Sequence, residues 1–412
     1  EQVLNTAKDQ FDTKLKESLE NDDKEAITQN ALSISSTLNI KRNSNQTNTD
    51  IDNNNGDDQE ESKKCLNDCS GNGECIDGKC KCDSGYVKSD CSLTENELEE
   101  KKDLRKKVLD VVSKSFTESK NEKPPSKEEI IQQSSIVSSI IKDPEETDTN
   151  LQEKSADFVD QILSTVQSDD QSNIIETVEL DEEIRENLSE SISSLVNAAF
   201  RRIQNSDPNT DEQIKQKRIS VKIRNSKSNL LRKILQNVLI GENPIKNVQQ
   251  NIQSIIQKQR ASILNKGKSI EIERNGNKIK VKPKIEIPSK VFDEIIGEDK
   301  VEETNINYRA LNYEKNPYVY SNKSQNITST VLSFKLLNEN NENEISVYNV
   351  SKPFKFEIPI KKSLFEELNS DSNNTKKTPV CKYWDDNTES WKIDGCEMEE
   401  IKANDSILCS WF

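Results

Sequence analysis

The stretch that decides the fold lies near the end of the chain and reads Cys381-Lys-Tyr-Trp384, then Trp391, then Gly395-Cys396, and finally Cys409-Ser-Trp-Phe412. The spacing of these residues is informative about the fold, because this order of cysteines and tryptophans rarely arises by chance. Large aromatic side chains are also ordinary anchors of a β-sandwich core. We therefore predict that Trp384 and Trp391 lie buried beside bonded cysteines in a β structure.

The residues just before this stretch alternate between apolar and polar, which is the period of a β-strand. Ile270 and Ile272, the turn 275–277, and Ile279 and Val281 predict a β-hairpin. Further strands are predicted at Ile285–Ile287, Ile306–Leu311, Thr330–Leu336, Ile345–Val350 and Phe354–Ile360. We therefore assign residues 269–412 to an antiparallel β-sandwich.

Helical periodicity dominates the rest of the chain. Two helices are predicted within residues 1–40, on either side of a break at 20–23. Residues 92–268 are predicted to be helical, with Ser126 to Glu129 as a capping box and Gly241 as a C-cap. Their apolar stripes contain Val108, Ile136, Phe158 and Leu188, with a last stripe at 245, 248, 252, 255 and 256. These stripes indicate an ordinary helical core.

Six cysteines lie close together between the two helical regions, at positions 65, 69, 75, 80, 82 and 91. So short a segment cannot bury a core, so covalent links must hold it. A zinc cluster using Cys80 and Cys82 is the alternative, but the even number of cysteines and the lack of any histidine argue against it. The polar residues 41–64 predict a flexible linker, and we expect the module at 65–91 to share little with its neighbours.

Composition narrows the classes of function. The 412 residues are 31% hydrophobic and 32% charged, with a net charge of −16. This charge argues against nucleic acid or an anionic membrane as a partner, and no apolar run approaches the roughly 18 residues of a membrane span. The absence of histidine, of a phosphate-binding glycine loop and of metal-ligand spacing predicts no enzyme and no cofactor. The chain reads as a piece of something longer.

Cysteine clustering also indicates an oxidising compartment. Seven Asn-x-Ser/Thr sequences are candidate glycosylation sites that agree with this, although the abundance of these residue types makes chance matches common. They are Asn45, Asn187, Asn322, Asn326, Asn349, Asn373 and Asn404.

The C-terminal stretch 381–412 resembles the GPS motif, the last part of the GAIN domain of adhesion receptors and polycystin-like membrane proteins. Val350-Ser-Lys-Pro353 also resembles a GAIN stretch, and residues 13–38 and 102–166 loosely resemble the helical half of polycystin relatives. The resemblance implies helical subdomain A followed by β-sandwich subdomain B. It also implies a Cys381–Cys409 disulfide, with Gly395, Trp384 and Trp391 as anchors of the motif.

This chain departs from the GPS pattern in two ways. The family pairs its second cysteine with a residue two positions after the third, and that residue here is Trp411, so Cys396 is left over. Either Cys396 is free, or its partner lies beyond Phe412, or the stretch aligns with the pattern in another register. In the family, a histidine and a hydroxyl residue then cut the chain. That triplet is not in this sequence, so we expect no catalytic residue here.

The six-cysteine module resembles an EGF-like module of the tenascin type, with Gly85-Tyr86 before its last cysteine. The resemblance implies the pairs Cys65–Cys75, Cys69–Cys80 and Cys82–Cys91. Residues 60–64 lack the acidic pattern of the calcium-binding variant, so we predict no metal.

Together these resemblances imply an extracellular stalk fragment of a polycystin-like receptor or channel, on the plasma or ciliary membrane. Its expected roles are cell adhesion, ligand recognition or mechanical signalling. The expected partners are protein or glycan ligands and the membrane-embedded segment that follows, with no insertion into the membrane by the fragment itself. A structural glycoprotein of a cell-surface coat is the alternative.

Overall fold

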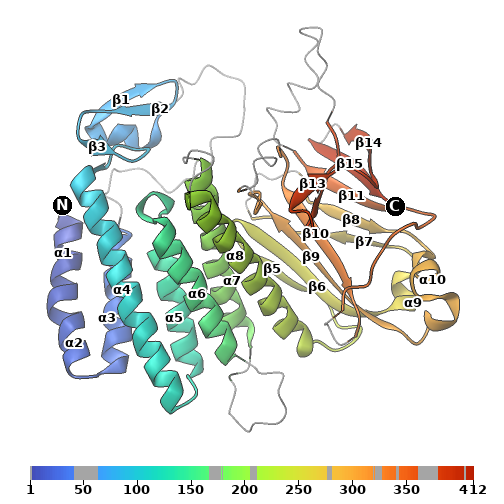
Figure 1. Cartoon of the computed structure of the whole chain (residues 1–412), viewed down its shortest axis with the longest axis horizontal. Coiled ribbons are helices and arrows are strands. Elements are labelled where there is room, and N and C mark those ends of the chain that lie inside the picture. Colours follow the sequence, from blue (N-terminus) through green and yellow to red (C-terminus); the bar gives the residue numbers. More distant parts are fainter. Residues whose placement is uncertain are drawn as a thin grey trace. The chain divides into compact units, whose positions relative to one another are not determined.

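The structure, a computed structural model, describes residues 2–40, 64–166, 178, 180–204, 211–275, 281–318, 320, 327–339, 343–360, 379–402 and 405–412. The chain divides into two compact units, Glu1–Asp207 and Pro208–Phe412. The first contains helices and a small disulfide-rich module, and the second contains a long helix and two main antiparallel sheets (Figure 1). The predicted α+β class is therefore confirmed.

The helices of the first unit lie side by side (Figure 1). They are α1 (Gln2–Gln10), continued through the π turn Phe11–Leu15 into α2 (Lys16–Glu20), then α3 (Lys24–Leu38), α4 (Glu95–Glu122), α5 (Lys127–Ile140), α6 (Thr149–Thr165) and α7 (Glu182–Gln204). Short polar side chains set their starts: Asp23 accepts from the Ala26 amide, and Ser126 accepts from the Glu129 amide. Thr94 and Glu97 form a full capping box at α4.

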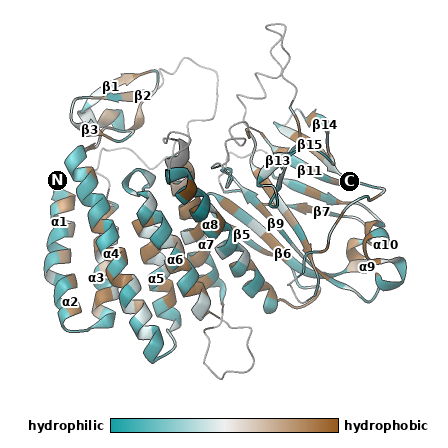
Figure 2. Cartoon of the chain, in the orientation of Figure 1, coloured by the Kyte–Doolittle hydropathy of each residue, from teal (hydrophilic) through white to brown (hydrophobic). Residues whose placement is uncertain are grey.

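The predicted apolar stripes form the core of this unit. Ile34, Val108 and Ile136 are fully buried, and Phe116 packs edge-to-face against Phe158 at 5.6 Å between ring centroids. Helix α3 packs against α1, α4 and α5, and α7 packs against α5 and α6. Figure 2 shows hydrophobic residues recurring among hydrophilic ones along these helices.

The disulfide-rich module is inserted between α3 and α4. It contains the 3-10 turn Leu66–Gly71, the hairpin β1 (Gly73–Ile76) and β2 (Lys79–Cys82), and β3 (Tyr86–Val87). Strand β3 pairs with β4 (Leu93–Thr94), which leads directly into α4. The module therefore passes into the helical region without a linker on this side.

The second unit begins with α8 (Asp211–Gln236) and continues as a sandwich. One sheet has the strand order β10-β9-β6-β5, with β5 at Ile245–Val248, β6 at Ile252–Arg260, β9 at Asn305–Tyr313 and β10 at Val331–Leu337. The other has the order β14-β15-β11-β8-β7, with β7 at Lys268–Glu271, β8 at Lys284–Ile287, β11 at Phe354–Pro359, β14 at Cys396–Lys402 and β15 at Ser406–Trp411. The predicted C-terminal antiparallel β-sandwich is thus confirmed.

Both sheets contribute to one core. Ile306 and Tyr308 of β9 pack in the same buried cluster as Ile285 of β8 and Phe354 of β11. The short helices α9 (Ala261–Leu264) and α10 (Val291–Ile296) add Leu264 and Phe292 to it, and the 3-10 turn Glu298–Lys300 follows α10. Among the helices that the structure describes in both units, none is long and apolar enough to cross a membrane.

The last predicted helical stripe, at 245–256, is wrong. These residues form β5 and β6, so the β region begins well before 269. The apolar residues match a helical spacing by coincidence. Strand β6 is buried along nearly its whole length, including Gln253 and Gln257, and therefore lacks the alternation that identifies a half-exposed strand.

Three smaller expectations also differ from the structure. Residues 345–350 form no strand; Ile345 donates its amide to Leu336 and packs on the core as an irregular segment. Strand β7 pairs with β8, whose residues 284–287 come after the predicted return strand at 279–281. Residues 276–280 lie outside the described residues. Helix α8 ends at Gln236, and Gly241, with φ of +85°, lies in a later turn instead of capping it.

Candidate functional site

The predicted tryptophans lie on a small hairpin formed by β12 (Tyr383–Asp385) and β13 (Ser390–Lys392), where Trp384 and Trp391 are directly opposite. Asp385 holds the turn between the strands. Its carboxylate accepts from the Asn387 amide at 3.1 Å and from the Thr388 hydroxyl at 2.6 Å, and it pairs with Lys392 at 2.6 Å. The hydrogen bond from Lys392, followed by that from Thr388, lowers the pKa of Asp385 to about 2.

The two tryptophans pack against residues that the sequence did not single out. Tyr318 stacks on Trp384 at 4.3 Å and meets Trp391 edge-on at 5.6 Å. The guanidinium of Arg224, from α8, lies 4.4 Å from the centroid of the Tyr318 ring. Burial raises the pKa of Tyr318, so its hydroxyl stays neutral. The hairpin is therefore fixed to α8 through a cation and three aromatic rings.

This packing corrects the expectation that both tryptophans are buried beside the disulfide. Trp384 and Trp391 are half-buried. The buried cluster around Cys381 and Cys409 contains Ile360 and Ile407, with Phe356, Ile358, Cys396 and Met398 packed against it. The tryptophans have a separate set of neighbours because Tyr318 covers them.

Cys381 and Cys409 form a disulfide with Cα atoms 6.0 Å apart. Both are nearly fully buried. Cys409 lies on β15, opposite Phe356 of β11 on one side and Met398 of β14 on the other. The disulfide therefore ties the segment before β12 to a strand that has backbone partners on both edges.

Cys396 keeps a free thiol at the start of β14. Its partner across the strands is Trp411, the residue at the position where the GPS pattern has its last cysteine. Burial, with a smaller effect of Asp394, raises the pKa of this thiol to about 12, so it stays protonated. Trp411 in turn meets Tyr383 edge-on at 4.5 Å. An aromatic contact thus occupies the place of a second disulfide.

Gly395 has a conformational reason to precede Cys396. Its φ is +77°, a value that side chains other than glycine rarely adopt. Its carbonyl accepts from the Phe412 amide at 3.4 Å, so this turn brings β14 into register with β15.

A cavity of about 1110 Å³ lies beside this site. Its apolar wall includes Phe334, Phe356, Ile407 and Trp411, and Cys396 and Cys409 also line it. Asp385 and Lys335 bring charge to its edge. The lining of this site is therefore suited to holding apolar side chains and strands. The sequence contains no histidine that could act as a general base.

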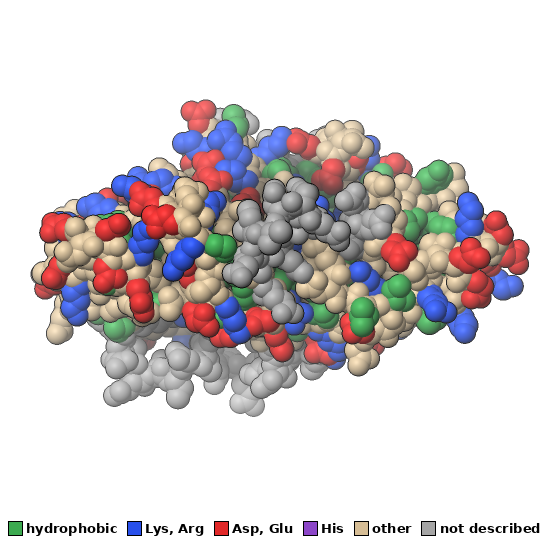
Figure 3. Space-filling model, turned by 90° about the horizontal axis from the view of Figure 1, so that it is seen from below, with side chains coloured by type: hydrophobic (Ala, Val, Ile, Leu, Met, Phe, Trp, Pro, Cys, Tyr) green, Lys and Arg blue, Asp and Glu red, His purple; other side chains and the backbone are tan. Residues whose placement is uncertain are grey.

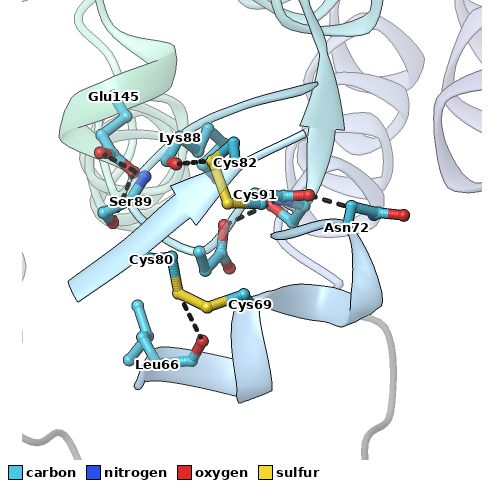
Figure 4. Close-up of a disulfide and its surroundings, with 11 residues drawn as sticks. Leu66, Cys69, Asn72, Cys80, Cys82, Lys88, Ser89, Cys91 and Glu145 are labelled. Atoms are coloured by element: carbon cyan, nitrogen blue, oxygen red, sulfur yellow. Dashed lines mark hydrogen bonds between the residues drawn. A yellow bond between two sulfur atoms is a disulfide. The ribbon is translucent and has the colours of Figure 1, made fainter. Parts of the chain in front are cut away.

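The six cysteines of the disulfide-rich module form three disulfides, in the pairs that its resemblance to an EGF-like module implies. Cys65–Cys75, Cys69–Cys80 and Cys82–Cys91 have Cα atoms 5.6, 5.4 and 5.3 Å apart. The last two are drawn in Figure 4. Sulfur atoms of Cys65, Cys69 and Cys80 lie within 4.8 Å of one another, as in a metal site, but each is already bonded to another sulfur.

Two candidate glycosylation sites lie in the described residues and differ in environment. Asn349 is exposed in an irregular segment. Asn187 is half-buried on α7, where its amide donates to the Glu183 carbonyl at 2.9 Å and accepts from the Ser135 hydroxyl at 2.9 Å. A glycan on Nδ2 of Asn187 would have to fit at this half-buried position. The other five, Asn45, Asn322, Asn326, Asn373 and Asn404, lie outside the described residues.

Comparison with known proteins agrees with the geometry of the second unit. Residues 242–411 match the family model of the GPS motif, described as GAIN subdomain B. Residues 242–411, which contain β5 to β15, are therefore similar to GAIN subdomain B.

Among solved structures, the full extracellular region of zebrafish Gpr126/Adgrg6 is similar, with a TM-score of 0.44 and 12% identity. The alignment covers 70% of this chain and 34% of that one, so this chain spans about a third of its length. No curated protein matches the sequence.

Proposed function

We propose that this chain is part of the extracellular stalk of an adhesion-type or polycystin-like membrane protein. The observation that carries the proposal is the position of β15. It lies between β14 and β11, with six paired positions on each side, and the Cys381–Cys409 disulfide joins it to the segment before β12. A strand held in this way can bear a load applied along the chain, because many backbone hydrogen bonds must break together before it moves.

The stalk would act in adhesion, ligand recognition or mechanical signalling, at the plasma membrane or on a cilium. Its partners would be protein or glycan ligands together with a membrane-embedded segment of the same protein. Acidic and basic side chains are interspersed on the face seen in Figure 3, and the net charge is −16. Such a surface favours protein or neutral glycan partners over nucleic acid.

The proposal can be tested on the full-length protein in its own cells. An epitope tag inserted in residues 41–63 should be stained on intact, unpermeabilised cells. The tagged protein should stay in the membrane fraction after high salt and alkaline carbonate, and only detergent should release it. Release by salt or carbonate alone would contradict a membrane receptor and support a glycoprotein of the cell coat. A tag stained only after permeabilisation would contradict both.

A further inference from the structure

A buried carboxylate lies where the EGF-like module meets the helices. Glu146, in the 3-10 turn Pro144–Glu146 between α5 and α6, is 2% exposed. It pairs with three cations: Arg105 at 2.6 Å, Lys101 at 3.0 Å and Lys88 at 3.1 Å. Lys101 and Arg105 belong to α4, whereas Lys88 belongs to the module. One carboxylate therefore joins three segments of the chain.

Arg105 extends this cluster to the ends of two helices. Its side chain is fully buried, and it donates to the carbonyls of Ser139 and Ile140, at the end of α5, at 3.1 and 2.9 Å. It also donates to the side chain of Asn39, just after α3, at 2.9 Å. A cation at helix C-termini satisfies carbonyls that lack partners within the helix. The cluster is thus part of the framework of the helical unit.

The module adds contacts of its own. Lys88 pairs with Asp143 at 2.7 Å, and its side chain is only 9% exposed. The amide and hydroxyl of Ser89 donate to Glu145 at 3.0 and 3.1 Å, as Figure 4 shows. Lys88 therefore contacts the half-buried carboxylate of Asp143 as well as the buried carboxylate of Glu146, which it shares with Lys101 and Arg105.

The pKa shifts of Glu146 and Lys88 agree with this pairing. Burial alone would raise the pKa of Glu146, but Arg105, Lys88 and Lys101 outweigh it and lower the pKa to about 2. Burial would lower the pKa of Lys88, but Asp143 and Glu146 outweigh this effect and raise the pKa, so Lys88 stays protonated. Breaking a buried pair by removing one partner is costly because it leaves a buried charge uncompensated.

A second attachment lies a few residues away. Strand β3 of the module pairs with β4, and the Glu95 amide, at the start of α4, donates to the Gly85 carbonyl at 3.3 Å. The module is thus fixed at its last strand and also at Lys88. Two separate attachments remove the rotation that a single linker would allow.

We propose that the EGF-like module and the helices of the first unit form one rigid body, with the ion cluster around Glu146 as the lock between them. This differs from the independent module that the polar segment 41–64 suggests. The orientation of the module would then be set by α4 and by the turn Pro144–Glu146, and a pull on the module would load these elements directly.

Distance measurements on the full chain test the proposal. Spin labels on p-acetylphenylalanine at the exposed positions Glu74, in β1, and Glu128, at the start of α5, leave every disulfide intact. Double electron–electron resonance should give one narrow distance distribution. Lys88→Met keeps the apolar stem but removes the charge, and it should broaden the distribution at least twofold. Lys79→Met, at an exposed lysine of the same module, is the matched control and should leave the width unchanged.

Hydrogen exchange separates loosening from unfolding. In Lys88→Met, the amides of β1 and β2 should keep their protection, while exchange at 85–95 should rise by tenfold or more. A narrow distribution in Lys88→Met, equal to that of the unsubstituted chain, would overturn the lock. A broad distribution in the unsubstituted chain would overturn the rigid body itself.

Discussion

The disulfide-rich module at 65–91 and the C-terminal sandwich are both cross-linked, but their disulfides serve different purposes. In the module the buried cluster consists of Cys65, Cys69 and Cys91, with Cys80 and Cys82 packed against it. The sandwich has instead a core of aliphatic and aromatic side chains from both sheets, and Cys381–Cys409 belongs to a separate, smaller cluster. A disulfide can thus replace a hydrophobic core, or it can clamp one strand to a core that already exists.

Backbone conformation sharpens this contrast. Four successive residues of the module, 67–70, have positive φ values between 50° and 54°. Residues with a Cβ pay roughly 1–2 kcal/mol each for this conformation, and so small a module buries little apolar surface to offset it. In the turn that leads into β14, the residue Gly395 also has a positive φ, and a glycine adopts it without that penalty. The module therefore depends on its covalent links more than the sandwich does.

The largest effect should follow from removing one of the module's disulfides. Cys69→Ala with Cys80→Ala should unfold residues 65–91, because loss of a disulfide in a small domain costs about 2–5 kcal/mol and little else holds this one. Hydrogen exchange followed by mass spectrometry should show full exchange in β1 and β2 within seconds. Helices α5 to α7 should keep their protection. Persisting protection in β1 and β2 would show that the module has a core beyond its sulfur atoms.

The ion cluster should give the next largest effect. Glu146→Gln leaves Arg105 and Lys101 buried without their carboxylate and should destabilise the first unit by about 3–5 kcal/mol. Urea unfolding followed by far-UV circular dichroism reports mainly on this unit. All three tryptophans, at 384, 391 and 411, lie in the second unit, so the midpoint of their fluorescence should not move.

This cluster also predicts a dependence on pH. The pKa of Glu146 is about 2 in the folded chain and 4.5 ordinarily, so its contribution is complete above about pH 5 and is lost as pH falls through 2. The shift corresponds to about 3 kcal/mol. The free energy of unfolding measured by circular dichroism at pH 6, 4 and 3 should therefore fall more steeply in the unsubstituted chain than in Glu146→Gln. Equal slopes would show that Glu146 is not the group responsible.

Sequence patterns predicted the features that depend on neighbours along the chain. The break at 20–23 separates α2 from α3, the start of α5 follows from Ser126, and the apolar stripes of α4 to α7 face the core. Strands β9, β10 and β11 lie within two residues of their predicted bounds. These features could be predicted because a cap or an alternating stripe depends only on residues that are close together in the sequence.

The features that sequence reasoning missed join residues far apart in the chain. Lys88 and Glu146 meet across 58 positions, and lysine and glutamate are exposed by default, so no local pattern marks them as buried. Tyr318 likewise reaches Trp384 from another segment, and Arg224 reaches Tyr318 from a third. Strand β6 was misassigned because Gln253 and Gln257 are buried in it, which hides the period of the strand. The Tyr318-Val-Tyr320 pair of aromatic residues was the one available signal for the cluster around the tryptophans.

The clamp in the sandwich should have a smaller effect than either change in the first unit. Cys381→Ser with Cys409→Ser opens a link between residues 28 positions apart and should destabilise the second unit by about 3.5 kcal/mol by loop-closure entropy. The midpoint of tryptophan fluorescence in urea should fall, while circular dichroism of the helices should change little. Cys396→Ser is the matched control, because it removes a cysteine but leaves the disulfide. A midpoint unchanged in the double variant would mean that β15 is held by its backbone partners alone.

The smallest effect should come from restoring a cysteine opposite Cys396. The Phe412 amide donates to the Gly395 carbonyl, so the next pair, Cys396 and Trp411, is in the non-hydrogen-bonded register, where Cα atoms lie about 4.5 Å apart. That spacing suits a disulfide, and Trp411→Cys should form one in an oxidising host.

The number of free thiols in denatured protein should then drop from one to zero. The net gain in stability should be about 1–2 kcal/mol, because loop closure contributes about 3 kcal/mol and the lost contact between Trp411 and Tyr383, with the packing of the indole ring, offsets part of it. Trp411→Ser, which loses the same contact without the new bond, separates the two contributions. Two free thiols in Trp411→Cys would show that the strands are not held in this register, and β15 would then lack the pairing on which its role as a clamped strand depends.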